Sequence, residues 1–294
     1  MYNYLLFILM AICSVVNSAV ITKRYQLEAG TKFRASAVYA LICGVISAAV
    51  AAVVLLVKHQ PLQATRFSLV CAAAMVLVSL MEMYYTLKAL SMDKIAVVRT
   101  ITTVGAMVLS CVWGAVILRE HITPLRLCGI GVIIAAVLLL SLARETRVKL
   151  SHVLLSLLPA VFSAAGSIIS KQHQVEQVYA HVDTLSFSVW VGLIRAGVFA
   201  LIVPLMVRRS ADGLGQSKRS MLFAALSSFI SGITYIVSLH LAKILPISVT
   251  TPLFTSLSLI LSAVFGRIIY RERLNARTAA AVLMALAGAL MMMR

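Results

Sequence analysis

The sequence predicts an all-α polytopic membrane protein with ten transmembrane helices arranged as two inverted five-helix repeats. Three observations support this fold class. Of the 294 residues, 62% are hydrophobic and only 12% are charged, against roughly 25% charged in an average soluble domain. The apolar residues form blocks of about 20, the length of helix that spans a bilayer. The second half of the chain also repeats features of the first.

Ten apolar blocks are separated by short polar connections. Because lipid cannot satisfy the backbone, each block is expected to be a helix, and the alternation typical of transmembrane barrels is absent. The expected spans are 3–22, 35–57, 67–90, 95–118, 127–143, 150–171, 184–207, 220–242, 247–270 and 278–293. The longest connections, near 23–34, 172–183 and 208–219, are too short for a catalytic domain. The first block has no positively charged start or cleavage pattern, so we expect a span and not a signal peptide.

Small residues inside the blocks are expected to serve packing. Gly129, Gly131 and Gly288 on the fifth and tenth spans suit close contact between helices. The five cysteines also lie in apolar blocks at spacings that fit no metal site, and we interpret them as packing residues.

Basic residues outnumber acidic ones by 26 to 9, for a net charge of +17. They lie between apolar blocks and not in an aromatic-rich patch, so we expect them to fix topology and contact anionic lipid, and expect no nucleic-acid partner. Both termini are expected on the same side of the membrane, because the number of spans is even. The connections after odd-numbered spans are the more basic, which favours termini outside the cytoplasm.

An internal repeat relates the two halves. A shift of 152 residues (272 minus 120) places Arg119-Glu120 on Arg271-Glu272 without a gap. The same shift pairs Thr103 with Thr255, Ser110 with Ser262 and Gly114 with Gly266. We therefore predict repeats at 1–148 and 149–294. Five crossings per repeat make the second repeat inverted, an arrangement that can present one central site to each side in turn.

These repeated stretches resemble a known family. Residues 89–134 and 241–288 each combine a small-residue helix end, a tight turn, a helix, an acidic-basic corner and a Gly/Ala-rich closing helix. The corners are Arg119-Glu120-His121 and Arg271-Glu272-Arg273. The pattern resembles the second half of an EamA-type repeat of the drug/metabolite transporter superfamily, and NSAVITK at 17–23 is similar to the family's first-helix ending.

The resemblance implies a ten-helix secondary carrier of small organic solutes, whose central cavity is formed mainly by helices one to four and six to nine. The family usually has its termini inside the cytoplasm, whereas the distribution of basic residues in this sequence favours termini outside it. We expect a location in the bacterial cytoplasmic membrane, lipid and a small-molecule solute as partners, and coupling to a proton or counter-solute; a monomer is compatible with the sequence. No enzymatic activity, cofactor or metal is expected, since no phosphate-binding loop, metal cluster or nucleophile elbow is visible.

Charged side chains inside spans are the first candidates for function, since each costs about 3 kcal/mol to insert. Glu82, Arg99 and Arg195 lie deepest. Glu82 and Arg99 lie on neighbouring helices, so they can form a structural ion pair; alternatively Glu82 is a proton or cation site. Arg195 has no carboxylate nearby in sequence and is expected to bind an anionic ligand or Glu82 itself.

A row of hydroxyl side chains is the second candidate. Arg99 and Thr103 share a face of the fourth span, and Thr251 and Thr255 share the equivalent face of the ninth. Such residues serve either helix packing or a polar pathway. Trp190 is expected to supply an aromatic wall or to anchor the helix at the interface.

The predicted function is gradient-driven or exchange transport of a small organic metabolite, anionic or zwitterionic, by alternating access. One alternative is a multidrug or cation exporter with Glu82 as its proton-coupling site. A membrane-embedded lipid-modifying enzyme is the alternative from another class, but the nine acidic residues are scattered and do not form paired motifs.

Overall fold

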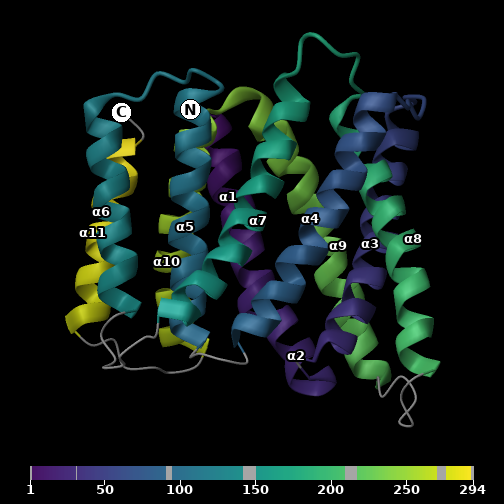
Figure 1. Ribbon diagram of the computed structural model, residues 1–294, viewed down its shortest axis with the longest axis horizontal. Coiled ribbons are helices and arrows are strands. Elements are labelled where there is room, and N and C mark those ends of the chain that lie inside the picture. Colours follow the sequence, from purple (N-terminus) through teal and green to yellow (C-terminus); the bar gives the residue numbers. More distant parts are fainter. Residues whose placement is uncertain are drawn as a thin grey trace. The chain divides into compact units, whose positions relative to one another are not determined.

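The computed structural model describes residues 2–30, 32–90, 95–141, 150–208, 217–269 and 276–292. These residues are helical apart from short connections (Figure 1). The helices are α1 (Tyr2–Val16), η1 (Asn17–Thr22), α2 (Lys23–Ala29), α3 (Phe33–Val57), α4 (Arg66–Leu90), α5 (Ile95–Val116), α6 (Pro124–Ser141), α7 (Leu150–Val175), α8 (Thr184–Arg208), α9 (Lys218–Ile244), α10 (Ile247–Ile269) and α11 (Ala276–Met292).

The predicted all-α fold with ten helices is confirmed. With α1, η1 and α2 counted as one continuous rod, the described residues form ten helices. Six of them are long and apolar enough to cross a membrane, beginning with Asn3–Ala29, and the other four contain shorter apolar segments. The chain is therefore a polytopic membrane protein.

Two helices extend further than the sequence predicts. The first runs to Ala29 instead of ending near residue 22, because Tyr25 is buried and its hydroxyl donates to the Ala35 carbonyl at 2.6 Å. α7 runs to Val175 instead of ending near residue 171. Its last turns carry polar side chains that are buried and hydrogen-bonded, so their polarity does not mark a loop.

The chain divides into two compact units. The first unit comprises Met1–Leu77 and Ile169–Lys243, and the second comprises Val78–Ile168 and Ile244–Arg294. Each unit takes segments from both predicted repeats, 1–148 and 149–294, which stay a prediction. The boundary passes through α4 and α7, so each of these helices contributes to both units.

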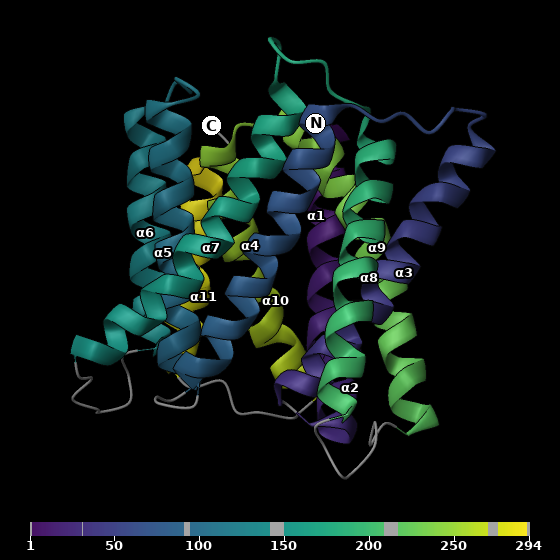
Figure 2. The ribbon, with the colours of Figure 1, turned by 45° about the vertical axis from the view of Figure 1, so that its right-hand side comes forward.

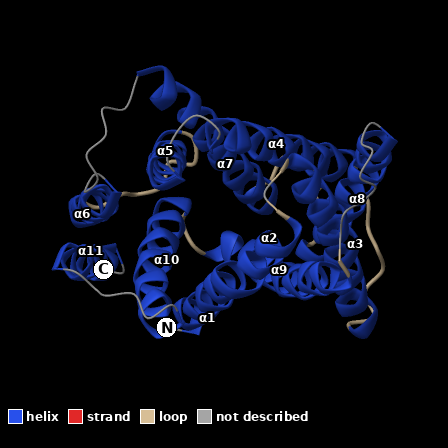
Figure 3. Cartoon of the chain, turned by 90° about the horizontal axis from the view of Figure 1, so that it is seen from below, coloured by secondary structure: helices blue, strands red, loops and turns tan. Residues whose placement is uncertain are grey.

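In the first unit α3 packs against α8 at two glycines (Figures 2 and 3). A Cβ atom on Gly44 would lie 2.6 Å from the Ala196 nitrogen, and one on Gly192 would lie 2.7 Å from the Ala48 nitrogen. The two backbones therefore touch, a packing mode that small residues allow in membrane helices. Sequence analysis did not single out either glycine.

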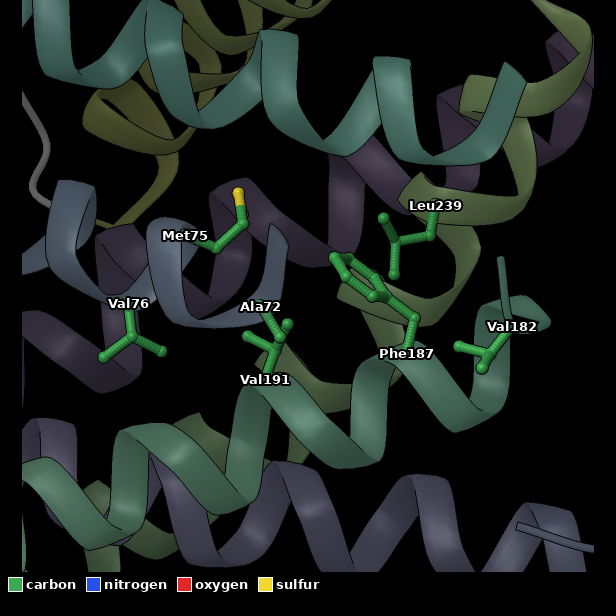
Figure 4. Close-up of a cluster of buried hydrophobic side chains, with 7 residues drawn as sticks. All are labelled: Ala72, Met75, Val76, Val182, Phe187, Val191 and Leu239. Carbon is green, nitrogen blue, oxygen red and sulfur yellow. The ribbon is translucent and has the colours of Figure 1, made fainter. Parts of the chain in front are cut away.

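An apolar core in the same unit joins α4, α8 and α9. Figure 4 shows Phe187 of α8 beside Leu239 of α9, with Ala72 of α4 near Val191 of α8. Phe187 is completely buried. The remaining members of the cluster are Met75, Val76 and Val182.

In the second unit α6 packs against α11 (Figure 3). A Cβ atom on Gly288 would lie 2.6 Å from Ile133 Cγ1 and 2.9 Å from the Gly129 carbonyl oxygen. The predicted packing role of Gly129 and Gly288 is thus confirmed. That of Gly131 is wrong: no atom lies within 4 Å of the position its Cβ would take, because Gly131 faces away from α11.

Candidate functional site

A hydrogen-bond network lies inside the first unit, centred on Ser227 of α9. The Ser227 hydroxyl is 2.8 Å from Thr22 Oγ1 and 2.8 Å from the Tyr39 hydroxyl. Asn17 Nδ2 donates to the Ser227 carbonyl at 3.0 Å and to Ser231 Oγ at 2.9 Å. The network therefore ties the first helix and α3 to α9. We call these residues (Asn17, Thr22, Tyr39, Ser227 and Ser231) the Ser227 network.

The first helix departs from α-geometry at this network. Asn17–Thr22 is a π-helical segment, in which the N–H of residue i+5 bonds to the carbonyl of residue i. In an α-helix, residues five apart point about 140° apart around the axis, because 3.6 residues complete a turn. The wider π turn brings Asn17 and Thr22 to the same side, so both reach Ser227. Such π segments occur frequently at functional sites.

Arg195 lies close to the middle of α8, 11 residues from each end of the span Thr184–Met206. Its side chain is half-buried, and Nη1 donates to Cys43 Sγ at 3.7 Å. The close approach of Gly44 to Ala196 brings Cys43 and Arg195, the residues next to them in the chain, together. Among the described residues Arg195 makes no ion pair, so four of its five N–H donors lack a protein acceptor there.

Trp190 is placed at one end of the first unit and not at its centre. Its Nε1 donates to the Gln63 carbonyl at 2.8 Å, and its ring packs against the Phe187 core. Gln63 lies in the connection before α4. This geometry ties a connection to α8 and favours the anchoring alternative, while a role of Trp190 in solute binding stays a prediction.

A second polar network at this end was not anticipated from the sequence. His173 is completely buried, with its ring stacked on Phe187 at 3.7 Å between centroids. Its two ring nitrogens contact Ser68 Oγ at 2.8 Å and Gln174 Nε2 at 3.1 Å. Next to it, the buried ammonium of Lys171 donates to the Ala242 carbonyl in the last turn of α9 at 2.6 Å. These contacts link the ends of α4, α7 and α9.

The other predicted residues lie in the second unit. Thr255 is buried, and its hydroxyl donates to the Thr251 carbonyl one turn earlier at 3.0 Å. Thr103 is exposed on α5, and Glu82 is half-buried on α4. The side chain of Arg99 lies outside the described residues. That these five residues bind solute together with Trp190 and Arg195 stays a prediction.

Glu120 has a role that its position in the acidic-basic corner did not reveal. Its carboxylate accepts hydrogen bonds from the backbone N–H groups of Ile247 and Ser248 at 2.8 and 3.0 Å, and from Ser248 Oγ at 2.6 Å. It therefore caps the N-terminus of α10, where unpaired N–H groups favour an anion. Arg119, at φ 50°, turns the chain so that Glu120 reaches this helix end. A Cβ atom on Gly114 would lie 2.7 Å from Glu120 Oε2, so glycine makes room for the carboxylate.

Within the described ranges, no three His, Cys, Asp or Glu side chains gather to hold a metal ion. The arrangement instead offers hydrogen-bond donors and acceptors near the middle of the spans. Helical transporters commonly hold their solutes at this depth.

Comparison with known proteins agrees with this picture. Residues 150–294 match the EamA-like transporter family. A solved structure, described only as a crystal structure of a protein, superimposes with a TM-score of 0.78 at 13% sequence identity, over 100% of this chain and 98% of that one. No curated protein sequence matches. The solved structure supports the fold alone, whereas the family match supports transport of small solutes and not enzymatic activity. Residues 150–294 are therefore an EamA-like transporter domain, which makes the chain a member of the drug/metabolite transporter superfamily.

Proposed function

We propose that the protein is a secondary transporter, gradient-driven or exchanging, that moves a small anionic or zwitterionic metabolite by alternating access. One observation carries the proposal: Arg195 holds a guanidinium at the middle of a span, with a thiol as its single hydrogen-bond acceptor among the described residues. The proposed location is the bacterial cytoplasmic membrane.

The physical argument concerns the cost of that charge. A guanidinium near the bilayer centre is unfavourable by about 3 kcal/mol on insertion scales, and such residues normally pair with an acid or line a solute pathway. A thiol is a weak acceptor and carries no formal charge when protonated. Since the described residues supply no carboxylate to Arg195, the carboxylate or phosphate of a solute is the partner that fits its planar fork.

Alternating access is supported by the sequence repeat and by the polar groups at mid-span. Residues 1–148 and 149–294 are expected to be inverted copies, and two inverted copies can exchange conformations around a shared site. In this proposal the first unit contributes Arg195 and the Ser227 network. The sequence also nominates Thr103, Thr251, Thr255, Glu82 and Arg99 as solute-binding residues, and that nomination stays a prediction.

The test is solute binding and uptake by the purified full chain in proteoliposomes, using labelled L-malate, glycolate and L-phenylalanine as probes. Arg195→Met should weaken binding of any accepted anion about 100-fold or more, because it removes a charge-assisted pair. Arg195→Lys keeps the positive charge and should retain part of the affinity that Arg195→Met loses. Arg66→Gln is the matched control, because Arg66 is an exposed arginine at the start of α4. Equal affinity in Arg195→Met and wild type would exclude the proposal.

The alternative of a cation exporter places proton coupling at Glu82. The half-buried carboxylate within a span favours it, since burial shifts the proton affinity of a carboxylate between two accessible states. Glu82→Gln should then abolish uptake driven by a pH gradient and leave exchange at equal pH unchanged. If gradient-driven uptake of a cation survives this substitution, the alternative is excluded.

A further inference from the structure

The amide of Asn17 can form its two hydrogen bonds in one orientation only. One amide atom lies 3.0 Å from the Ser227 carbonyl oxygen. A carbonyl oxygen only accepts, so the atom that faces it must be the donor Nδ2. Oδ1 therefore points away from this carbonyl. It is buried, and it has no hydrogen-bond partner among the described residues.

An unpaired buried acceptor requires an explanation, because the great majority of such groups in proteins are paired. A flip of the amide would break the bond to Ser227, and a shift of the backbone is opposed by Thr22, which holds the other end of the π turn to Ser227. The structure thus holds a carbonyl oxygen in a fixed position without a donor from the described part of the chain.

This acceptor and the proposed anion site both lie in the interior of long apolar helices of the first unit. Asn17 is 14 residues from one end and 12 from the other end of the span Asn3–Ala29, and Arg195 is central in its own span. Helix α3 contacts the neighbours of both groups: Tyr39 reaches the Ser227 hydroxyl, and Cys43, about one turn later, accepts from Arg195. The residue that holds Asn17 and the residue that binds Arg195 are therefore linked through one helix, α3.

We propose that Asn17 Oδ1 is a solute-binding subsite, which accepts a hydrogen bond from an O–H or N–H group of the transported anion. The inference rests on the proposed function, in which Arg195 holds the anionic group. It narrows the solute class to small organic anions and zwitterions that also carry a hydroxyl or amine donor, such as hydroxy acids and amino acids. The π turn positions this acceptor, because it places Asn17 and Thr22 on the same side of the helix, where both form hydrogen bonds to Ser227.

The experiment compares matched probes that differ in the donor. The pairs are L-malate with succinate, glycolate with methoxyacetate, and L-phenylalanine with 3-phenylpropanoate, measured by binding to the purified full chain and by counterflow in proteoliposomes. In at least one pair, wild type should bind the donor-bearing member about tenfold more tightly. Asn17→Leu should abolish this preference and leave the affinity for the donor-free member within about twofold.

Two further variants keep the test decisive if Asn17→Leu does not fold. Thr22→Val leaves the amide in place but removes the hydroxyl that fixes the π turn, and it should reduce the preference about threefold. Ser18→Ala changes an exposed neighbour whose hydroxyl bonds to the Val15 carbonyl, and it should have no effect. Each variant is checked for monodispersity and melting temperature.

The outcomes separate the subsite from the function. Equal affinity within every pair for wild type, a preference that persists in Asn17→Leu, or a preference in Thr22→Val as large as that of wild type would overturn the subsite and leave the role of Arg195 intact. If none of the six compounds binds, or if Arg195→Met binds them as wild type does, the proposed function fails as well.

Discussion

The helix pairs α3–α8 and α6–α11 are held together in the same way but have different surroundings. In both pairs glycines let two backbones touch. Beside the glycines of α3–α8 lie Cys43 and Arg195. Beside those of α6–α11 lie the apolar side chains Ile133, Met291 and Met292. Close backbone contact therefore serves to position a charged group in one pair and serves packing alone in the other.

The largest effect is expected when the α3–α8 contact is widened. In Gly192→Ala the new Cβ would lie 2.7–2.9 Å from backbone atoms and the Cβ of Ala48, which cannot rotate away. We expect a loss of about 2–3 kcal/mol in the free energy of unfolding. Because Arg195 lies one turn further along α8, solute binding should weaken too.

Gly197→Ala is the matched control on the same helix. No atom lies within 4 Å of the position its Cβ would take, and alanine is favoured over glycine in a helix by up to about 1 kcal/mol. Its melting temperature should equal or exceed that of wild type. A melting temperature that falls equally in both variants would contradict the close contact of α3 with α8.

In the second unit, the hydrogen bonds of Glu120 lie at a helix end and not at mid-span. Glu120→Ala tests their contribution to stability. The substitution leaves the N–H groups of Ile247 and Ser248 without their carboxylate. We expect the free energy of unfolding to fall by about 2 kcal/mol in Glu120→Ala. In Glu120→Gln it should fall by less. Thermal unfolding in detergent checks this, and a neutral Glu120→Ala would show that the cap adds nothing to stability.

A smaller effect is expected in the apolar pair. In Gly288→Ala the new Cβ would lie 2.6 Å from Ile133 Cγ1, a side-chain atom that can move, and 2.9 Å from one backbone atom, the Gly129 carbonyl oxygen, whereas Gly192→Ala meets two backbone atoms and a Cβ. We expect a loss of about 1 kcal/mol and unchanged solute affinity, in contrast to Gly192→Ala. Gly131→Ala, which meets no neighbour, serves as the control. Weaker solute binding in Gly288→Ala would remove the distinction between the two pairs.

The smallest effect concerns Glu176, just beyond α7 in the first unit. The backbone N–H of Val178, and then the side chain of Gln172, hold its pKa below the usual value. The carboxylate therefore contributes stability above the ordinary glutamate pKa, about 4.3, and this contribution is lost as the pH falls through the lower pKa of the folded protein. The melting temperature of Glu176→Gln should change less with acidification than that of wild type, and parallel pH profiles would contradict this.

Hydropathy and spacing were sufficient to predict the helices, because lipid forces every apolar block to satisfy its own backbone. They also predicted a packing role for the glycines of the two closing helices, which holds for Gly129 and Gly288 but not for Gly131. Arg195 could be identified as a candidate because a charge in the middle of an apolar block is visible in the sequence alone.

The features that were missed depend on partners distant in the chain. The π turn at Asn17 is stabilised by Ser227, 210 residues later, and hydropathy does not distinguish a π turn from an α turn. Glu120 caps a helix that begins 127 residues further on. Polar side chains near His173 suggested a connection, but burial reversed that interpretation. The local sequence pattern carries no information about these contacts between distant residues.

The contact of Lys171 with the Ala242 carbonyl has a mechanical consequence. The last carbonyls of a helix lack partners and carry partial negative charge, so a buried ammonium bound there at 2.6 Å resists separation. The end of α7 and the end of α9 are thereby pinned together. Because Ser227 lies on the same α9 as Ala242, this contact joins the end of α7 to the helix that holds the π turn of Asn17–Thr22.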